Sequence, residues 1–154
     1  MNHIYNSDTI SHFLSENKSK RIIFTNGCFD LLHPGHVQYL ADAKSLGDIL
    51  IVGLNSDTSV TQLKGPNRPI NDQVFRSQML LALKPVDAVI IFEEDTPISV
   101  LSIIKPNIHV KGGDYQPEQL PEYETVVSNG GEVKCVSFIE GYSSSEIIAK
   151  ILAN

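Results

Sequence analysis

Apolar runs alternate along the chain with stretches in which apolar residues recur at helical spacing. The runs are rich in Ile, Val and Leu and are unbroken by polar residues, which is typical of strands buried on both faces of a parallel sheet. Strands that alternate with helices predict an α/β fold, a five-stranded parallel sheet with helices on both faces. The five predicted strands lie at residues 21–24, 48–54, 86–92, 108–110 and 132–138.

The length of 154 residues predicts a single domain over residues 1–154. Residues 21–152 contain all the predicted strands and are expected to form its core. Residues 1–20 are expected to form a helical extension, with Ser7 or Asp8 as the helix cap. This extension is polar and lacks the apolar segment of a signal peptide, and no apolar run in the chain is long enough to span a membrane.

The net charge and the cysteine content limit which ligands the chain could bind and which cysteine-based sites it could form. The net charge of −6 argues against a general nucleic-acid-binding protein, which would need a basic surface. A polyphosphate ligand would need a local cluster of basic groups. Cys28 and Cys135 are too few for a disulfide framework or a cysteine-based zinc site. These features predict a cytoplasmic enzyme that acts on small molecules and contacts neither nucleic acid nor a membrane.

Residues 25–36 join the first predicted strand to the next helix and carry the most informative pattern in the chain. Pro34 fits the first turn of that helix, where its missing N–H is no loss. His33 and His36, three residues apart, point the same way from the helix start, where free N–H groups and the helix dipole favour phosphate. A bare pair of histidines is more often a capping or surface pair, but the preceding strand, glycine turn and aspartate favour a functional site.

Further candidates follow other predicted strands. Right-handed crossovers bring the loops at Gly27, Asn55 and Lys111 to one edge of the sheet, where open α/β sheets bind ligands. Residues 55–57 also suit a helix cap. The glycines after Lys111 allow close backbone approach by a flat base or ribose. The carboxylates at residues 93–95 are interpreted as a solvated helix start rather than a metal site.

Basic and hydroxyl side chains near these loops could meet an anion. Lys64 and Arg68 lie in a turn-rich loop, where such charges are usually solvated. Arg76 lies in the first turn of the next helix, and a structural salt bridge is its competing role. Ser143 begins the last helix and, with Glu146, fits a capping box, but a serine-rich helix start also offers hydroxyl and N–H groups to phosphate.

The motifs resemble those of the nucleotidyltransferase superfamily, which includes the cytidylyltransferases. Residues 33–36 resemble its HxGH signature, residues 27–30 match the accompanying G-x-F-D, and residues 141–148 resemble its closing G-x-S-[ST]-[ST]-x-I-I motif. The resemblance covers roughly residues 20–152 and implies a Rossmann-like domain. Residues 138–141 lack the arginine of the R-T-E-G found in many cytidylyltransferases. The absence of a dinucleotide fingerprint and of a P-loop disfavours the two other common nucleotide-binding classes.

Within the superfamily, the chain resembles the D-glycero-β-D-manno-heptose 1-phosphate adenylyltransferases, in the form that lacks a sugar-kinase part. The resemblance implies that ATP and heptose 1-phosphate give ADP-heptose and pyrophosphate, for lipopolysaccharide or S-layer glycan. Glycerol-3-phosphate cytidylyltransferases are the alternative, although they usually carry G-D-D-W where residues 112–115 read Gly-Gly-Asp-Tyr. A non-catalytic nucleotide sensor is the alternative of another class, and a zinc site at the two histidines would lack a third ligand.

The resemblance also implies roles for matching residues. Direct attack by the sugar phosphate on the α-phosphorus needs positioning and charge stabilisation but no covalent enzyme intermediate. Mg²⁺ is expected to arrive with ATP without a protein ligand, and a homodimer is expected. The residues assigned to stabilise the transition state and the leaving pyrophosphate are His33, His36, Lys64 and Arg76. The nucleotide is assigned to Asn26, Gly27, Cys28, Phe29, Lys111, Gly112, Gly113, Asp114, Ser143, Ser144 and Ser145. The residues assigned to the acceptor substrate are Asp30, Asn55, Asp57 and Arg68, although Asp30 could instead orient a histidine.

Overall fold

The computed structural model describes residues 3–154, so the first two residues of the expected N-terminal extension lie outside the described range. Its centre is a parallel sheet with the strand order β1-β4-β3-β2-β5-β6. The strands are β1 (Ile4–Tyr5), β2 (Ile22–Gly27), β3 (Ile49–Asn55), β4 (Ala88–Phe92), β5 (Ile108–Gly112) and β6 (Glu132–Val136). The helices are α1 (Ser11–Glu16), α2 (Pro34–Lys44), α3 (Asp57–Lys64), α4 (Gln73–Leu81), α5 (Ile98–Ile104), the 3₁₀ helix η1 (Pro117–Gln119), α6 (Tyr123–Ser128) and α7 (Ser144–Leu152).

The sheet confirms the predicted parallel α/β architecture but has six strands, so the predicted number of five is wrong. The additional strand, β1, is only two residues long and pairs with β4, with Ile4 opposite Val89 and Tyr5 opposite Ile90. Such a short, half-buried segment is too brief to show a strand pattern in the sequence. It protects the β4 edge of the sheet.

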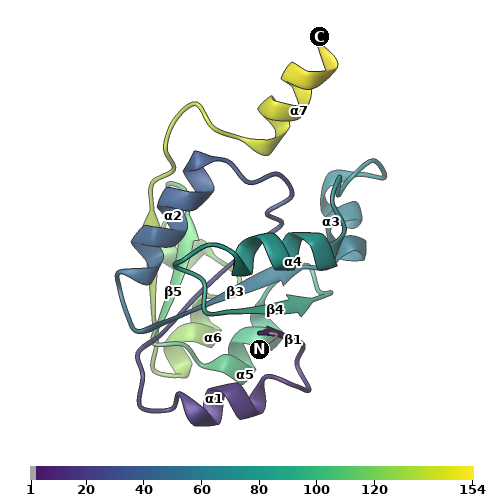
Figure 1. Cartoon of the computed structure of the whole chain (residues 1–154). Coiled ribbons are helices and arrows are strands. Elements are labelled where there is room, and N and C mark those ends of the chain that lie inside the picture. The colour runs from purple at the N-terminus through teal and green to yellow at the C-terminus, as the bar shows by residue number, and fades with distance from the viewer. Residues whose placement is uncertain (1–2) are drawn as a thin grey trace.

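Helices cover both faces of the sheet (Figure 1). On one face, α2 and α4 contribute Leu40, Ala43 and Leu80 to a core that includes residues of β2, β3 and β5. On the other face, α1, α5 and α6 pack against β2, β3 and β4 through Phe13, Leu101 and other buried residues. No helix within residues 3–154 is long and apolar enough to cross a membrane.

The N-terminal helix begins later than predicted. Ile10 occupies the cap position of α1 and no side chain caps the helix, so the prediction that Ser7 or Asp8 caps it is wrong. The Asn6 side chain instead accepts hydrogen bonds from the backbone N–H groups of Asp8 and Thr9, at 3.0 and 3.1 Å. These hydrogen bonds satisfy the backbone N–H groups of the turn, and Ile10, which follows the turn, is fully buried.

The topology places a crevice beside β2. From β2 the chain proceeds outward through β3 and β4, and it then returns to add β5 on the opposite side of β2. Open α/β sheets bind ligands at such a reversal, outside the carboxyl ends of the strands. Gly27, Asn55 and Gly112 end three adjacent strands at this edge, as the sequence predicted.

Candidate active site

A cavity of about 610 Å³ opens at the carboxyl end of β2. It brings together the turn after β2, the first turns of α2, the loop after α3 and the segment that leads into α7. These parts are far apart in the sequence, yet they include most of the predicted phosphate-binding residues. The cavity is lined by Gly27, Cys28, Phe29, Asp30, His33, Gly35, His36, Tyr39, Lys64, Arg68 and residues 138–146.

His33 and His36 stack on each other at the start of α2. Their ring centroids are 3.8 Å apart with an interplanar angle of 22°. His33 is the N-cap residue, and its Nδ1 accepts a long hydrogen bond of 3.4 Å from the His36 backbone N–H. The capping role considered for this pair is therefore present, and both rings also line the cavity.

The environment of both imidazoles favours their neutral form in the ligand-free protein. Burial and the neighbouring His33 lower the pKa of His36 from its ordinary value of 6.5 to about 4. Burial also lowers the pKa of His33, although the carboxylate of Glu146 opposes this shift. The Nδ1 atom of His36 is buried without a hydrogen-bond partner among residues 3–154. A phosphate oxygen that entered the cavity would accept a hydrogen bond from a ring N–H group of one of these two histidines.

Asp30 anchors the loop that follows Lys64, the last residue of α3, and that carries Arg68. Its carboxylate accepts hydrogen bonds from Arg68 Nε at 2.8 Å and from the backbone N–H groups of Ile70 and Asn71 at 3.0 Å. Although burial opposes the shift, these hydrogen bonds lower the pKa of Asp30. The sequence left open whether Asp30 orients a histidine or the acceptor. Its hydrogen bonds instead fix the loop on the wall of the cavity.

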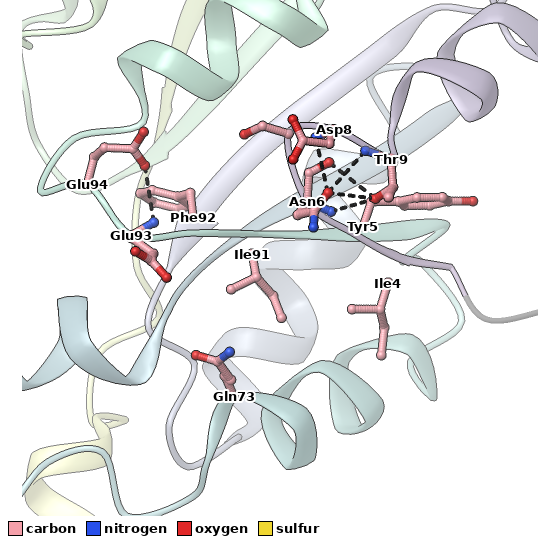
Figure 2. Close-up of a pocket in the computed structure, with 11 residues that line it drawn as sticks. Ile4, Tyr5, Asn6, Asp8, Thr9, Gln73, Ile91, Phe92, Glu93 and Glu94 are labelled. Atoms are coloured by element: carbon pink, nitrogen blue, oxygen red, sulfur yellow. Dashed lines mark hydrogen bonds between the residues drawn. The ribbon is translucent and has the colours of Figure 1, made fainter.

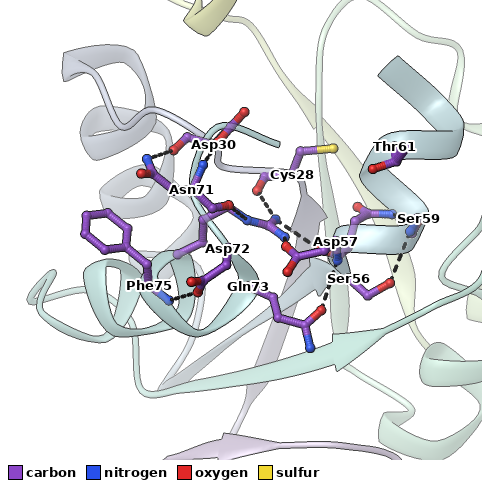
Figure 3. A network of polar contacts seen from close by, with 12 residues as sticks. Cys28, Asp30, Ser56, Asp57, Ser59, Thr61, Asn71, Asp72, Gln73 and Phe75 are labelled. Carbon is purple, nitrogen blue, oxygen red and sulfur yellow. Dashed lines mark hydrogen bonds and ion pairs between the residues drawn. The ribbon is translucent and has the colours of Figure 1, made fainter. Parts of the chain in front are cut away.

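Arg76 is buried at the centre of a polar network. Figure 3 shows its partners Cys28, Asp57 and Asn71 gathered from different parts of the chain. Its guanidinium donates to the carbonyl oxygens of Cys28, Asn55 and Asn71, at 2.6, 2.9 and 2.9 Å. It also donates to Asp57 Oδ1 at 2.7 Å. Only 1% of Arg76 is exposed and it is not among the lining residues of the cavity. The competing role as a structural salt bridge is therefore the one observed, and this geometry gives no support to direct contact with pyrophosphate.

Asn55 and Asp57 also belong to this internal network. Asn55 is 4% exposed and its side-chain Nδ2 donates to Ser59 Oγ at 2.9 Å. Ser56 caps α3 by accepting from the Ser59 backbone N–H at 3.1 Å, which confirms the helix-cap interpretation of residues 55–57. Neither Asn55 nor Asp57 lines the cavity, so the structure brings these two acceptor candidates to Arg76 but not to the predicted site residues on the cavity wall.

The serines at the start of α7 lie on the wall of the same cavity as Lys64. Ser143 caps α7 and accepts from the Glu146 backbone N–H at 3.0 Å, as the capping interpretation predicted. Ser144 Oγ donates to the Leu31 carbonyl at 2.8 Å, and the Tyr142 ring lies parallel to His33 at a centroid distance of 6.1 Å. Helix α7 projects from the body of the molecule (Figure 1), and these contacts attach its first turn to the histidine segment.

The predicted base-binding stretch, residues 111–114, lies beside the cavity and does not line its wall. Lys111 Nζ is 3.6 Å from Glu122 Oε1, and the buried His109 Nε2 is 3.0 Å from the same oxygen. Although burial opposes the shift, the His109 hydrogen bond and the Lys111 charge lower the pKa of Glu122 to about 2. His109 is thus a hydrogen-bonded interior histidine, as expected from its apolar strand.

Asn26 and Cys28, which the sequence assigned to the nucleotide, differ in their position relative to the cavity, and three aromatic residues on its wall were not predicted. The side-chain oxygen of Asn26 is buried without a partner among the described atoms, and Asn26 is not on the cavity wall. Cys28 is on the wall, where burial raises the pKa of its thiol. Aromatic wall residues missed by sequence reasoning are Tyr39, Phe138 and Tyr142.

A larger cavity of about 780 Å³ lies at the β1–β4 edge of the sheet (Figure 2). Its wall combines the Asn6 turn with the acidic residues Glu93 and Glu94 and with Gln73. None of its lining residues, all within the described part of the chain, is basic or a histidine. Both cavities have carboxylates on their walls, but only the cavity at β2 also offers cations and imidazoles to an anionic ligand.

Comparison with known proteins agrees with this geometry. The cytidylyltransferase-like family matches residues 24–150. The bifunctional protein HldE of Pelobacter propionicus is 50% identical over 151 residues, which cover 97% of this chain and 31% of that protein. HldE of Haemophilus ducreyi is 49% identical over 97% of this chain and 32% of its own length. The chain therefore spans about a third of the length of these curated relatives.

Solved structures are also similar to this chain. The lipopolysaccharide core biosynthesis protein of Thermoplasma volcanium is 31% identical, with a TM-score of 0.63 over 80% of this chain and 99% of that chain. Pantoate-beta-alanine ligase from Francisella tularensis, with a TM-score of 0.65 over 100% of this chain and 79% of that chain, shares the fold at 18% identity. With two stacked histidines at the helix start beside β2 and a family match over most of its length, the chain belongs to the cytidylyltransferase-like family.

Proposed function

We propose that the chain transfers AMP from ATP to D-glycero-β-D-manno-heptose 1-phosphate, giving ADP-heptose and pyrophosphate. The observation that carries the proposal is the cavity at β2. It gathers the imidazoles of His33 and His36, the cations of Lys64 and Arg68, and the serine-rich start of α7 around one space. Helix starts, neutral imidazole N–H groups and cations are the donors that a triphosphate needs.

The choice of substrates rests on similarity. About half of the residues are identical to those of HldE proteins over nearly the whole chain. A protein named for lipopolysaccharide core biosynthesis is similar over 80% of the chain. Both fit the motif resemblance to heptose 1-phosphate adenylyltransferases, and neither name points to a glycerol phosphate acceptor.

The proposed chemistry is a direct displacement at phosphorus. An oxygen of the sugar phosphate attacks the α-phosphorus of ATP, the new P–O bond forms, and the bond to the bridging oxygen of pyrophosphate breaks. His36 and His33 donate hydrogen bonds to the oxygens that gain charge in the transition state. Lys64 neutralises the charge of the leaving pyrophosphate, and the first turn of α7 with Ser143, Ser144 and Ser145 holds its outer oxygens.

Arg76 acts in this proposal as a positioning residue rather than as a direct ligand of phosphate. Its hydrogen bonds to the carbonyl oxygens of Cys28 and Asn55 fix the turns that follow β2 and β3. Asp30 acts similarly on the loop after α3, because it binds Arg68 and two backbone N–H groups of that loop. Both residues support the geometry that holds the reactants near in-line alignment.

A divalent metal ion generally accompanies ATP in nucleotidyl transfer, and we propose Mg²⁺. Within residues 3–154 no group of three or more His, Cys, Asp or Glu side chains is arranged to hold a metal. The phosphates and water would therefore hold the ion, as Mg²⁺ commonly is held. Bound in this way, it would supply charge neutralisation at the phosphates.

The remaining expectations complete the proposal. Residues 21–152 act as the catalytic core of a single domain, the protein works in the cytoplasm, and it forms a homodimer. Size-exclusion chromatography with light scattering tests the dimer, because a single species of about 17 kDa would contradict it.

Pyrophosphate release tests the reaction itself. The purified chain with Mg²⁺ is offered ATP or CTP, each with heptose 1-phosphate or glycerol 3-phosphate. We expect release only with ATP and the heptose phosphate, and mass spectrometry should then detect ADP-heptose. Release only with CTP and glycerol phosphate would replace the proposal by the cytidylyltransferase alternative. Bound nucleotide without release in any combination would support the sensor alternative.

A further inference from the structure

An exposed aromatic ring lies at one end of the cavity. Phe138 follows β6, and its side chain packs on the backbone of Gly112, where a Cβ atom would overlap the ring. The ring also lies beside Tyr39 of α2, with centroids 6.1 Å apart and planes at 39°. Despite these contacts Phe138 remains 63% exposed and lines the cavity. One side of the ring is thus supported by protein, and the rest is open to the cavity.

The support beneath this ring is firm. The Tyr39 hydroxyl hydrogen-bonds Thr25 Oγ1 at 2.6 Å and donates to the Val110 carbonyl at 3.1 Å. Tyr39 is only 7% exposed, and Gly113 N–H donates to the Val136 carbonyl at 2.9 Å, two residues before Phe138. These bonds join α2, β2, β5 and the end of β6 directly under Phe138. Such a fixed, exposed aromatic surface costs little conformational freedom when a flat ligand stacks on it.

The cavity is chemically divided along its length. Phe138 packs on Gly112 of β5, whereas Lys64 ends the helix that follows β3. Because β5 and β3 flank β2 on opposite sides, the aromatic ring and the cation line different parts of the cavity. His36 is near both parts, since its ring centroid is 5.2 Å from that of Phe29 after β2 and it precedes Tyr39 by three residues on α2. A nucleotide matches this division, since its base is flat and uncharged and its phosphates are anionic.

We propose that Phe138 is the platform on which the base of the nucleotide stacks. The proposal rests on the nucleotide-binding function proposed above and fixes the direction of the ligand, with its base on Phe138 and its phosphates toward His36 and Lys64. A purine covers more of a phenyl ring than a pyrimidine does. Phe138 therefore also contributes to a preference for ATP over CTP.

The test separates base binding from phosphate binding. Dissociation constants are measured for ATP, CTP and inorganic tripolyphosphate, all with Mg²⁺, on the full chain and on Phe138→Ala and Phe138→Tyr. We expect Phe138→Ala to weaken ATP about tenfold, the effect of losing one base–aromatic stack, and to weaken CTP less. Tripolyphosphate should bind with unchanged affinity, and Phe138→Tyr should retain the affinity for ATP.

Phe75→Ala is the matched control, because Phe75 is 48% exposed on α4 and lies outside the cavity. Unchanged ATP affinity in Phe138→Ala would overturn the proposal. An equal loss for ATP and tripolyphosphate would also overturn it, because the ring would then only support the segment before α7. A wild-type chain that binds ATP through Phe138 but releases no pyrophosphate would refute the proposed reaction and leave the platform standing. A wild-type chain that binds tripolyphosphate but not ATP would refute the platform.

Discussion

The Nη1 atom of Arg76 lies 2.6 Å from the carbonyl oxygen of Cys28 and donates a hydrogen bond to it. The same nitrogen donates to the carbonyl of Asn55 at 2.9 Å. One atom of α4 therefore sets the spacing between the turns after two adjacent strands, and the first of these turns leads to the histidine segment. The positions of the imidazoles depend on a side chain that does not reach the cavity.

Replacing Arg76 by lysine is expected to reduce both stability and turnover. Lysine keeps the charge but cannot span the carbonyl oxygens with one planar group. Loss of the donor to buried carbonyls should lower the free energy of unfolding by at least about 2 kcal/mol. Urea unfolding monitored by circular dichroism measures this loss. Asp57→Asn is the control with the smaller expected effect, because it leaves the three carbonyl bonds of Arg76 in place. Equal stability of Arg76→Lys and the wild type would refute the positioning role.

Replacing His36 by alanine should lower kcat by at least about 10², the scale seen when one transition-state donor is removed. Binding of ATP should weaken less, because the ground state uses other donors as well. Steady-state pyrophosphate release and a separate binding measurement distinguish the two effects. His12, exposed on α1, is the control histidine, and His12→Ala should behave as wild type. Full turnover in His36→Ala would exclude a catalytic role for this ring.

Replacing Lys64 by alanine should raise the KM for ATP and lower kcat. The ammonium group lies on the same cavity wall as Arg68 and, in the proposed reaction, meets the charge that builds on pyrophosphate. Lys84→Ala, which removes an exposed lysine outside the cavity, controls for the loss of one positive charge. If the two variants have the same kinetics, Lys64 is only a surface charge.

Acidification should destabilise the ligand-free protein through His36. Burial lowers the pKa of this group from 6.5 to about 4, so between these values the unfolded chain binds a proton that the folded chain does not. Stability should therefore fall as the pH falls from about 6.5 to about 4. Urea unfolding across this range measures the slope, and His36→Gln should make it shallower. An unchanged slope in that variant would show that other groups cause the loss.

Most of the fold could be predicted from the sequence because its strands are continuous apolar runs. Each of the strands β2 to β6 overlaps a predicted run, although β2, β3 and β5 continue one to three residues beyond it, and α2 begins at Pro34 as predicted. Strand β1 could not be predicted, because two half-buried residues become a strand only by pairing with β4. The cap of α1 was missed for a related reason, since Asn6 uses the local N–H groups in a turn.

The site was predictable where a local motif carries it and unpredictable where distant segments meet. His33 and His36 stand in one motif, and the structure brings them to Lys64, Arg68 and the α7 serines. The partners of Arg76 depend on three loops coming together, which spacing along the chain does not reveal. Phe138 was missed because it ends the strand predicted over residues 132–138, where an aromatic residue is usually part of the core, whereas β6 ends at Val136.

The turn from Gly27 to Asp30 is held by two arginines at once. Arg76 binds the carbonyl oxygen of Cys28 from beneath, and Arg68 binds the carboxylate of Asp30 from the side of the loop after α3. Asn71 links the two, because its carbonyl accepts from Arg76 and its amide groups donate to Asp30. The turn, the loop and the start of α4 are therefore joined in a closed ring of hydrogen bonds, so the other two segments resist a displacement of any one of them.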